Sequence, residues 1–415
     1  MEKHKKQCLI EFLRPKYQVC GKKKRGEILD ELVESLGVCR RQARRLMEPK
    51  PVGRPRKLDG RGRPSKYGVP GFEAALRFIW KKTRYMCSRH LHAAIPEWLP
   101  FIEAAYGPYP ANIRTLLLQV SASTIDRKLK PFKAVKGKST TNPGGFRDEI
   151  PIQGNIWNEH RPGFLEADTV AHCGGSLMGE YINSLTMVDI ATVWTETRCV
   201  CGKASGPIVS AIEDIEQCLP FDILGYDSDN GTEVLNTHIL RYFRDERIER
   251  GKKPVQVTRS RPYKSNDNAY VEQRNDSVPR RWLGYERLGF VELTPLVNYY
   301  FRDIVCPLIN HFFPTFKLAD KRRINSKTRR VYGTPITPYA RVMASPYVSD
   351  ERKKALKEIH VKLNPIVLSD LQYNLSKQID GALKNLRQGM PANLEYKPNP
   401  LFVFPKPDNL PLRKN

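Results

Sequence analysis

The stretch between Pro162 and about Gly284 restricts the fold of this chain more than any other part of the sequence. Apolar runs rich in β-branched residues, which are typical of strands, alternate there with stretches that have apolar residues at helical spacing. Three consecutive strands followed by alternating helices and strands predict an α/β core, with a mixed five-stranded sheet and flanking helices. The strands are expected at 164–170, 181–192, 194–201, 221–226 and 254–258, and the helices at 204–219, 233–249 and 268–281.

Three acidic residues lie where such a sheet would bring them to one place. Asp168 is within the first strand, Asp229 follows the fourth strand beside the turn-forming pair Asn230-Gly231, and Glu272 is on the last helix. Functional groups in open α/β sheets gather at the carboxyl ends of the strands. If the first and fourth strands are neighbours and the helix packs across their ends, the three carboxylates converge.

Converging carboxylates predict a divalent metal site, because unneutralised acids in one site repel each other and raise their own pKa values. Mg²⁺ or Mn²⁺ prefers oxygen ligands and keeps positions open for water and phosphate. Two ions can clamp the attacking and leaving oxygens of an in-line displacement. The expected reaction is phosphodiester cleavage, followed by attack of a DNA 3′-hydroxyl on another phosphodiester.

Three sequence motifs carry a resemblance to a known family. In chain order they are GFLEADTV, DSDNGTEVLN and TRSRPYKSNDNAYVEQRN. They resemble the catalytic core of bacterial insertion-sequence transposases of the retroviral-integrase type, over roughly residues 140 to 345. The resemblance implies an RNase H-like fold and makes Asp168, Asp229 and Glu272 the catalytic, metal-binding triad of a DDE transposase or integrase. The interval from Asp229 to Glu272 is longer than in the best-known members, with the extra residues expected around 249–254.

Other acids compete for the same roles. Asp227 is two residues from Asp229 and would share its side of an extended strand, and Glu166 competes with Asp168 for the same reason. The match to Asp-Asn-Gly favours Asp229, and the match to Asp-Thr favours Asp168. Asp189 and Glu196 are candidates for additional acids, although a paired structural carboxylate is the more common outcome on half-buried strands.

The charge of the chain points to nucleic acid as the partner. Lys and Arg number 70 against 44 Asp and Glu, which gives a net charge of +26, and residues 1–66 alone hold 20 basic against 8 acidic residues. Such a surface attracts polyanions and repels copies of itself. We therefore expect binding to double-stranded DNA, both element ends and target, and a homo-oligomer that forms on DNA.

The cysteines and the hydropathy indicate the cellular compartment in which the protein is expected. Nine scattered cysteines without a C-x-x-C pair indicate neither a disulfide framework nor a Cys-rich zinc site. No run of about 18 apolar residues is present, so neither a signal peptide nor a membrane partner is expected. The bacterial cytoplasm, with association to the nucleoid when DNA is bound, fits these features best.

Residues 1–48 predict a helix-turn-helix DNA-binding region. Apolar residues at helical spacing in 25–36, a turn at Gly37 and a second short helix make the pattern. A basic helical hairpin with a solvated face is the competing interpretation. The side chains expected to reach phosphates or base edges from the second helix are Arg40, Arg41, Arg44 and Arg45.

Residues 49–70 predict a basic linker that resembles the AT-hook, an extended Arg-Gly-Arg-Pro segment read in the minor groove. A solvated linker that holds phosphates without reading sequence is equally compatible. Residues 71–135 predict a second helical DNA-binding region, in which 121–130 is a candidate recognition helix capped by Ser121 or Ser123. The linker residues expected to contact DNA are Arg54, Arg56, Arg61 and Arg63.

The remaining segments are a connector at 136–161, the core at 162–290, a helical extension with a basic segment at 291–345, a small C-terminal domain at 346–396 and a Pro-rich tail at 397–415. Apolar residues around Pro365 favour a β-rich C-terminal domain, followed by a helix from about 369 to 387. Beside the predicted triad, a basic segment is expected to hold DNA, through Arg259, Arg261 and Lys264.

Two other functions fit parts of this pattern. An RNase H-like nuclease would cut DNA without joining it, but the predicted DNA-binding regions suit a protein that recognises element ends. A DNA-binding regulator that has lost catalysis would not need acids at all three triad positions. The sequence therefore favours a DDE transposase or integrase over both.

Overall fold

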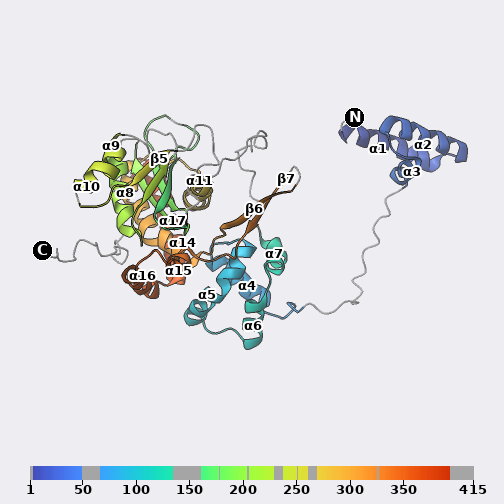
Figure 1. Cartoon of the computed structure of the whole chain (residues 1–415). Coiled ribbons are helices and arrows are strands. Elements are labelled where there is room, and N and C mark those ends of the chain that lie inside the picture. The colour runs from blue at the N-terminus through green and yellow to red at the C-terminus, as the bar shows by residue number, and fades with distance from the viewer. Residues whose placement is uncertain are drawn as a thin grey trace. The chain divides into compact units, whose positions relative to one another are not determined.

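The structure is a computed structural model that describes residues 3–48, 66–133, 160–176, 178–202, 205–228, 237–249, 251–259, 269–324 and 327–392. The chain divides into two units, residues 1–68 and residues 69–415, each with its own internal packing. Both are drawn in Figure 1. The predicted AT-hook-like residues, Asp229, Arg261, Lys264 and the Pro-rich tail lie outside the described residues.

The first unit consists of α1 (Lys3–Val19), α2 (Lys22–Leu36) and α3 (Arg40–Met47). Its buried centre includes Leu13 from α1, Leu32 from α2 and Met47 from α3. Gly37 ends α2 in the left-handed region at φ 64°, which a residue without a Cβ adopts at little cost. The structure has helices on both sides of Gly37, and α1, which the pattern did not indicate, completes the packing.

The second unit contains the predicted mixed sheet. Its strands run in the order β3-β2-β1-β4-β5, with β1 antiparallel to β2 and parallel to β4. β3 is antiparallel to β2, and β5 is parallel to β4. Each strand overlaps its predicted range, but β4 begins four residues later than expected. The strands are β1 (Phe164–Ala171), β2 (Ile182–Asp189), β3 (Thr195–Cys201), β4 (Gly225–Ser228) and β5 (Gln256–Arg259).

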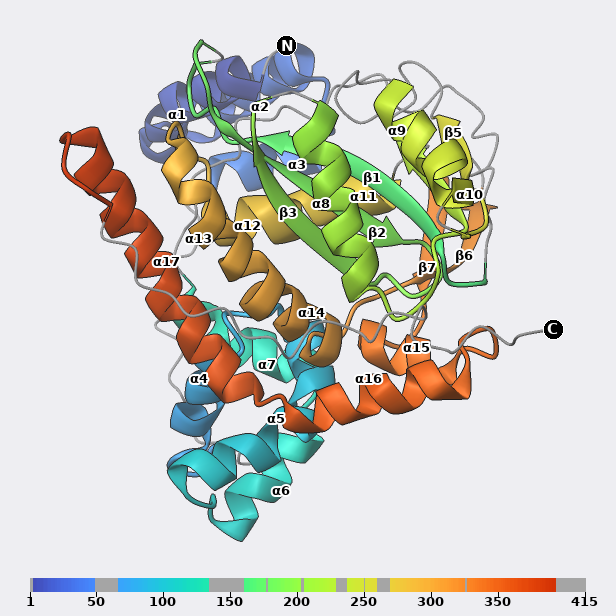
Figure 2. The same cartoon turned by 90° about the vertical axis from the view of Figure 1, so that its left-hand side faces the viewer.

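The two faces of β1 carry different side chains. Leu165 and Ala167 belong to a buried cluster that includes Ile212 of α8 (Ser205–Cys218). Successive residues of a strand point to opposite faces, so Glu166 and Asp168 lie on the other face, where α11 (Ala269–Asn275) contacts β1 and β2. Helices therefore cover both faces of the sheet (Figure 2). The alternation of apolar and acidic residues along β1 places its carboxylates under α11.

Three helices of this unit contain a wide π turn. Each of them is one continuous helix, in which α-helical segments lie before and after the π turn. The first is α9 (Thr237–Arg241), η2 (Tyr242–Glu246) and α10 (Arg247–Glu249). The second is α11, η3 (Asp276–Arg280) and α12 (Arg281–Leu283). The third follows η4 (Val291–Leu293) and runs through α13 (Thr294–Tyr299), η5 (Tyr300–Val305) and α14 (Cys306–Phe312). Single π turns are often found near functional sites.

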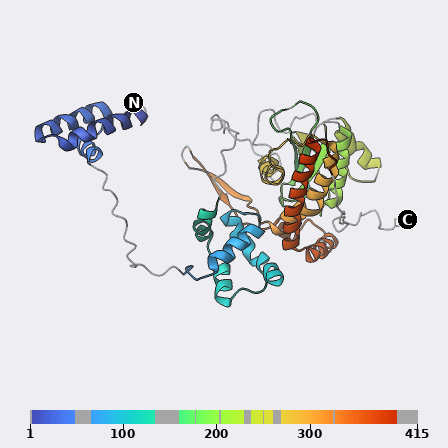
Figure 3. The same ribbon diagram turned by 180° about the vertical axis from the view of Figure 1, so that it is seen from behind.

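Residues 71–133 fold as α4 (Phe72–Lys82), α5 (Ser88–Tyr106), α6 (Ala111–Gln119), α7 (Ala122–Leu129) and η1 (Lys130–Phe132). Ser121 caps α7 by accepting a hydrogen bond from Thr124 N–H, one of the two caps that the sequence offered. The helices dock on the core, since the indole N–H of Trp98 donates to the Phe312 carbonyl at 3.0 Å. Figure 3 shows α4 and α5 beside the helices that follow the core.

The chain beyond the core corrects one prediction. Residues 346–392 contain α16 (Asp350–Lys362) and α17 (Pro365–Arg387), so the C-terminal region is helical and not β-rich. Asn364 accepts hydrogen bonds from Ile366 N–H and Val367 N–H, and Pro365 occupies the first turn, where proline is tolerated. The Pro365 that suggested interrupted strands therefore begins a helix of 23 residues.

A two-stranded hairpin and a short helix precede these helices. The hairpin is β6 (Leu318–Ile324) paired antiparallel with β7 (Lys327–Tyr332), within the segment predicted as a helical extension with basic residues. α15 (Pro338–Ala344) follows, capped by Thr337. Among the described residues, no helix has both the length and the apolar content that crossing a membrane requires.

Candidate active site

The competing acids of β1 and β4, Glu166 and Asp227, lie side by side. The two strands are parallel neighbours, in a register that pairs Glu166 with Asp227 and Ala167 with Ser228. Asp168 is two residues beyond Glu166, so it lies on the same face of the sheet. Asp227 is fixed from the next strand, because the Thr258 hydroxyl donates a hydrogen bond to it at 2.5 Å. The condition for convergence, that the first and fourth strands are neighbours, is met.

Glu166 anchors the helix that carries Glu272. Its side chain is buried and accepts hydrogen bonds from the backbone N–H groups of Tyr270 at 2.9 Å and Val271 at 3.0 Å, in the first turn of α11. Burial above all, together with the nearby charges of Asp227 and Glu272, raises the pKa of Glu166 to about 8, although the two N–H donors oppose the shift. The carboxylates of Glu166 on β1, Asp227 on β4 and Glu272 on α11 therefore interact electrostatically.

Asp168 is half-buried and contacts the same helix one turn later. Its Oδ2 accepts a hydrogen bond from the Asn275 amide at 2.6 Å, and its Oδ1 accepts one from Thr169 N–H at 2.7 Å. Glu272 precedes Asn275 by three residues, a spacing that places two residues on one side of a helix. Glu272 is exposed. The contact through Asn275 therefore brings the side of α11 that carries Glu272 to Asp168.

Asn275 also presents an unused oxygen. A carboxylate accepts hydrogen bonds and donates none, so the contact with Asp168 fixes the Asn275 NH₂ toward the acid. Its Oδ1 is buried and has no hydrogen-bond partner among the described residues. A buried oxygen without a partner is costly. An amide oxygen beside carboxylates is a ligand of the kind that hard divalent cations take, so these residues fit a metal of that class.

The turn between β2 and β3 holds α11 from its other side. Val193 lies there at φ 62°, a rare conformation for a β-branched residue. Its side chain packs with Val271 of α11, and its carbonyl accepts a hydrogen bond from Arg274 at 3.3 Å. Burial lowers the pKa of Arg274 to about 10. Backbone strain of this kind is found where surrounding contacts fix a functional element, and here it positions α11.

Asp189 is a structural acid. It is fully buried and accepts hydrogen bonds from Gly163 N–H, Thr192 N–H and the Thr192 hydroxyl, at 2.7, 2.7 and 2.6 Å. These contacts fix both the start of β1 and the strained turn. Burial raises the pKa of Asp189 to about 6 although the three donors oppose the shift.

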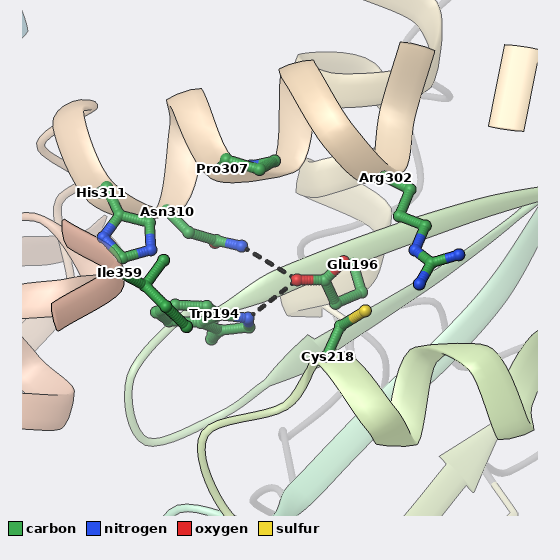
Figure 4. Close-up of a pocket in the computed structure, with 8 residues that line it drawn as sticks. All are labelled: Trp194, Glu196, Cys218, Arg302, Pro307, Asn310, His311 and Ile359. Atoms are coloured by element: carbon green, nitrogen blue, oxygen red, sulfur yellow. Dashed lines mark hydrogen bonds between the residues drawn. The ribbon is translucent and has the colours of Figure 1, made fainter. Parts of the chain in front are cut away.

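Glu196 is structural as well. Its carboxylate accepts hydrogen bonds from Trp194, Arg198 and Asn310. It lines a pocket between the end of α8, at Cys218, and α14. Figure 4 shows this pocket, and its dashed lines mark the bonds from Trp194 and Asn310. The space is about 20 Å³, room for roughly one water molecule. A substrate does not fit there, and the additional acids considered from the sequence are both satisfied internally.

The predicted site residues are only partly within the described chain. Asp168 and Glu272 belong to it and Asp229 does not, and the described residues contain no group of three or more His, Cys, Asp and Glu arranged to hold a metal ion. Arg41, Arg44 and Arg45 are exposed on α3, whereas Arg40 pairs with Asp30 of α2. Arg259 ends β5, and the structure describes its backbone alone.

Sequence reasoning missed Asn275, Arg274 and Val193. One signal was available for Asn275, which follows Glu272 by one helical turn within the recognised motif. No sequence signal marks Val193, because its role depends on a backbone conformation that valine rarely adopts.

Asp189→Asn is expected to lower the free energy of unfolding by about 1–3 kcal/mol at neutral pH, because one buried N–H donor loses its acceptor. The folded-state pKa of Asp189 is raised from 3.8 to about 6, so its contribution is fully present below pH 4 and declines as the pH rises to 6. The loss should therefore be larger at pH 4.5 than at pH 7.5. Urea unfolding at both values, with exposed Asp380→Asn as control, measures it; equal losses would contradict the pKa assignment.

No family model matches the chain. It is 33% identical over 340 residues to the uncharacterized protein y4rM of Sinorhizobium fredii, covering 80% of this chain and 93% of that one.

Two solved structures are distantly similar. The catalytic core domain of BIV integrase is 16% identical, with a TM-score of 0.21 over 29% of this chain and 66% of that chain, just under two thirds of its length. The simian T-cell lymphotropic virus intasome in complex with PP2A regulatory subunit B56 gamma is 13% identical, with a TM-score of 0.30 over 56% of this chain and 86% of that chain.

Proposed function

The chain belongs to the same family as protein y4rM of Sinorhizobium fredii, and we propose that it is a DDE-type transposase or integrase. It cuts DNA at the ends of a mobile element and joins those ends to target DNA. One observation carries the proposal: Asn275 links Asp168 to the side of α11 on which Glu272 lies. The mixed sheet, the order of the three motifs and the basic character of the chain support it.

We assign the metal-binding role to Asp168, Asp229 and Glu272. Asp229 follows Asp227 by two residues, as Asp168 follows Glu166, and Glu166 and Asp227 are register partners. Glu166 is buried beneath the first turn of α11 and binds its N–H groups, whereas Asp168 is half-buried, so Asp168 is the better ligand candidate on β1. On β4, the match to Asp-Asn-Gly favours Asp229 over Asp227, which accepts a hydrogen bond from Thr258. Two Mg²⁺ or Mn²⁺ ions held by these acids would supply a nucleophile and stabilise charge on the reacting phosphate.

The protein residues provide the positions for this chemistry. Glu166 and Val193 fix α11 against the sheet, and Asn275 orients the Asp168 carboxylate. Asp168 and Glu272 then present oxygens from two rigid elements, so little reorganisation is needed when DNA binds. The basic segment around Arg259, Arg261 and Lys264 is proposed to hold the DNA phosphates beside the acids.

A strand-transfer assay on DNA that carries the flanking ends of the parent element tests the proposal. The expected result in Mg²⁺ is cleavage at the element ends and covalent joining to a target duplex. Cleavage without a joined product would identify a nuclease. Binding to the ends without cleavage would identify a DNA-binding regulator, and either outcome would replace the proposed function.

The first unit is proposed to recognise the element ends through α3. Arg44→Ala/Arg45→Ala is expected to weaken binding to end DNA by about tenfold or more, since a base contact of arginine contributes roughly 1–3 kcal/mol. Binding to random duplex should weaken less. Lys23→Ala/Lys24→Ala removes the same charge from exposed positions of α2 and is the control. Equal loss of discrimination in both variants would contradict a recognition role for α3.

We propose further that subunits assemble on DNA. Joining two ends requires at least two active sites, and a net charge of +26 opposes association of the free protein. The expected result is a monomer without DNA and a multimer on paired ends, because DNA neutralises the basic regions. Light scattering with and without end DNA measures the change. A stable dimer whose mass does not change when end DNA is added would contradict it.

A further inference from the structure

The β6–β7 hairpin, residues 318–332, has a charge pattern that the proposed catalytic chemistry does not use. Its two strands contain six Lys and Arg and one Asp. The register pairs Lys321 with Arg330 and Arg322 with Arg329. At two successive positions, therefore, a basic residue of one strand lies directly opposite a basic residue of the other. Opposed like charges destabilise a two-stranded sheet. A bound polyanion would remove the repulsion, which gives the pattern a physical reason.

By the register, one face of the ribbon carries three basic residues and no acid. Residues opposite each other in an antiparallel pair share a face, and alternate residues along each strand return to it. The register therefore assigns Lys321, Arg323 and Arg330 to one face together with the neutral Thr328. The single acid of the hairpin, Asp320, belongs to the other face. A row of cations at strand spacing suits the phosphates that border a groove of duplex DNA.

The base of the hairpin is rigidly held. Gly333 N–H donates to the Lys317 carbonyl at 3.0 Å, and Thr315 and Ile336 form a further bridge. Phe316 packs against Tyr332 and against His90 of α5. Beyond this base the two strands extend away from the rest of the second unit, as both Figure 1 and Figure 3 show. A fixed base with projecting strands is the form of a ribbon that inserts into a groove.

The hairpin begins next to the candidate active site. The Lys317 ammonium donates to the Ala191 carbonyl at 2.9 Å, in the turn whose Val193 carbonyl accepts from Arg274 of α11. One turn of chain thus links the start of the hairpin to the helix that carries Glu272. DNA bound along the hairpin would be directed toward the acids.

We infer that the β6–β7 hairpin binds the major groove of duplex DNA next to the reacting strand. The major groove admits a two-stranded ribbon, and its walls are the phosphate backbones. The choice of DNA as the ligand rests on the proposed function. The inference itself concerns binding alone, so it stands or fails without reference to joining activity.

The test uses the full-length Lys321→Gln/Arg323→Gln/Arg330→Gln protein and a mixed-sequence duplex followed by fluorescence anisotropy. We expect at least a tenfold weaker affinity near 0.1 M salt. The slope of log affinity against log salt should fall by roughly 2 to 3, since each phosphate contact accounts for about 0.9. The matched control is Lys354→Gln/Lys357→Gln/Lys362→Gln, which removes the same charge from exposed positions of α16 and should change neither quantity.

An RNA duplex of the same sequence separates groove binding from general attraction. A-form RNA has a deep, narrow major groove that a ribbon does not enter, so the hairpin variant should lose much less affinity for RNA than for DNA. Equal losses on both duplexes, or equal losses in the hairpin and α16 variants, would overturn the inference. Thermal melts should show no loss of stability in the hairpin variant, because it removes an opposed like-charge pair. A protein that fails to join DNA but passes this test refutes the proposed function alone.

Discussion

Asp168→Asn protein is expected to lose DNA cleavage and strand transfer by at least about a hundredfold in Mg²⁺, while its affinity for end DNA stays unchanged. The substitution removes the charge of a proposed metal ligand, an interaction that contributes several kcal/mol to a phosphoryl-transfer transition state. The basic surfaces that bind DNA are left intact. Single-turnover cleavage and anisotropy on the same end DNA separate the two effects.

Variants of the neighbouring acids make this prediction specific. Asp229→Asn and Glu272→Gln should lose activity to the same extent, whereas Asp227→Asn, whose carboxylate accepts a hydrogen bond from Thr258, should be milder. The exposed Asp276→Asn on the same helix is the control and should retain activity. Wild-type cleavage by Asp168→Asn would remove it from the site, and the reverse ranking of Asp227 and Asp229 would reassign the ligand on β4.

Trp98→Ala is expected to lower the free energy of unfolding by about 3–5 kcal/mol, the usual cost of truncating a buried aromatic residue. Trp98 is fully buried, its ring lies near Phe312 and Phe313, and its N–H donates to the end of α14. The substitution removes packing and leaves the Phe312 carbonyl without its donor. Urea unfolding measures the loss, and amide exchange should increase in α4–α7 more than in β1 and β2.

Two further variants identify the source of that loss. Trp98→Phe keeps an aromatic ring but not the donor, so it should cost less than the alanine variant. Leu118→Ala shortens a side chain of the same helical region that is 40% exposed, and it should change stability little. If Trp98→Ala unfolds with wild-type stability, the docking of α4–α7 on α14 is not maintained by this residue.

The sequence alone determined the order and type of the core elements. Strands 164–170 and 194–201 were predicted from their apolar, aromatic and β-branched residues, which fit the pleated surface of a sheet. The helices around 204–219 and 268–281 were predicted for a related reason, since their apolar residues recur at the period of one buried face. The turn at Gly37 and the cap at Ser121 were local signals of the same kind.

The C-terminal region shows where local pattern fails. Ile359, Val361 and Ile366 are β-branched and flank Pro365, a combination that favours strands when read alone. In the folded chain, Asn364 caps α17, and Gln372 of that helix donates a hydrogen bond to the buried Tyr300 hydroxyl. Contact with the helix that contains Tyr300, distant in sequence, overrides the weak intrinsic preference of β-branched residues.

For the site, the sequence determined which residue types are present and roughly where they lie along the chain. It left Glu166 and Asp168 as alternatives, because two residues on one side of a strand have the same pattern. Tertiary structure gives the two acids different contacts: the pairing of β1 with β4 and the packing of α11 give Glu166 the helix N–H groups and give Asp168 the Asn275 amide. Such contacts join residues about a hundred positions apart, and local patterns cannot specify them; the folded sheet decides them because it fixes which backbone donors are within reach of each carboxylate.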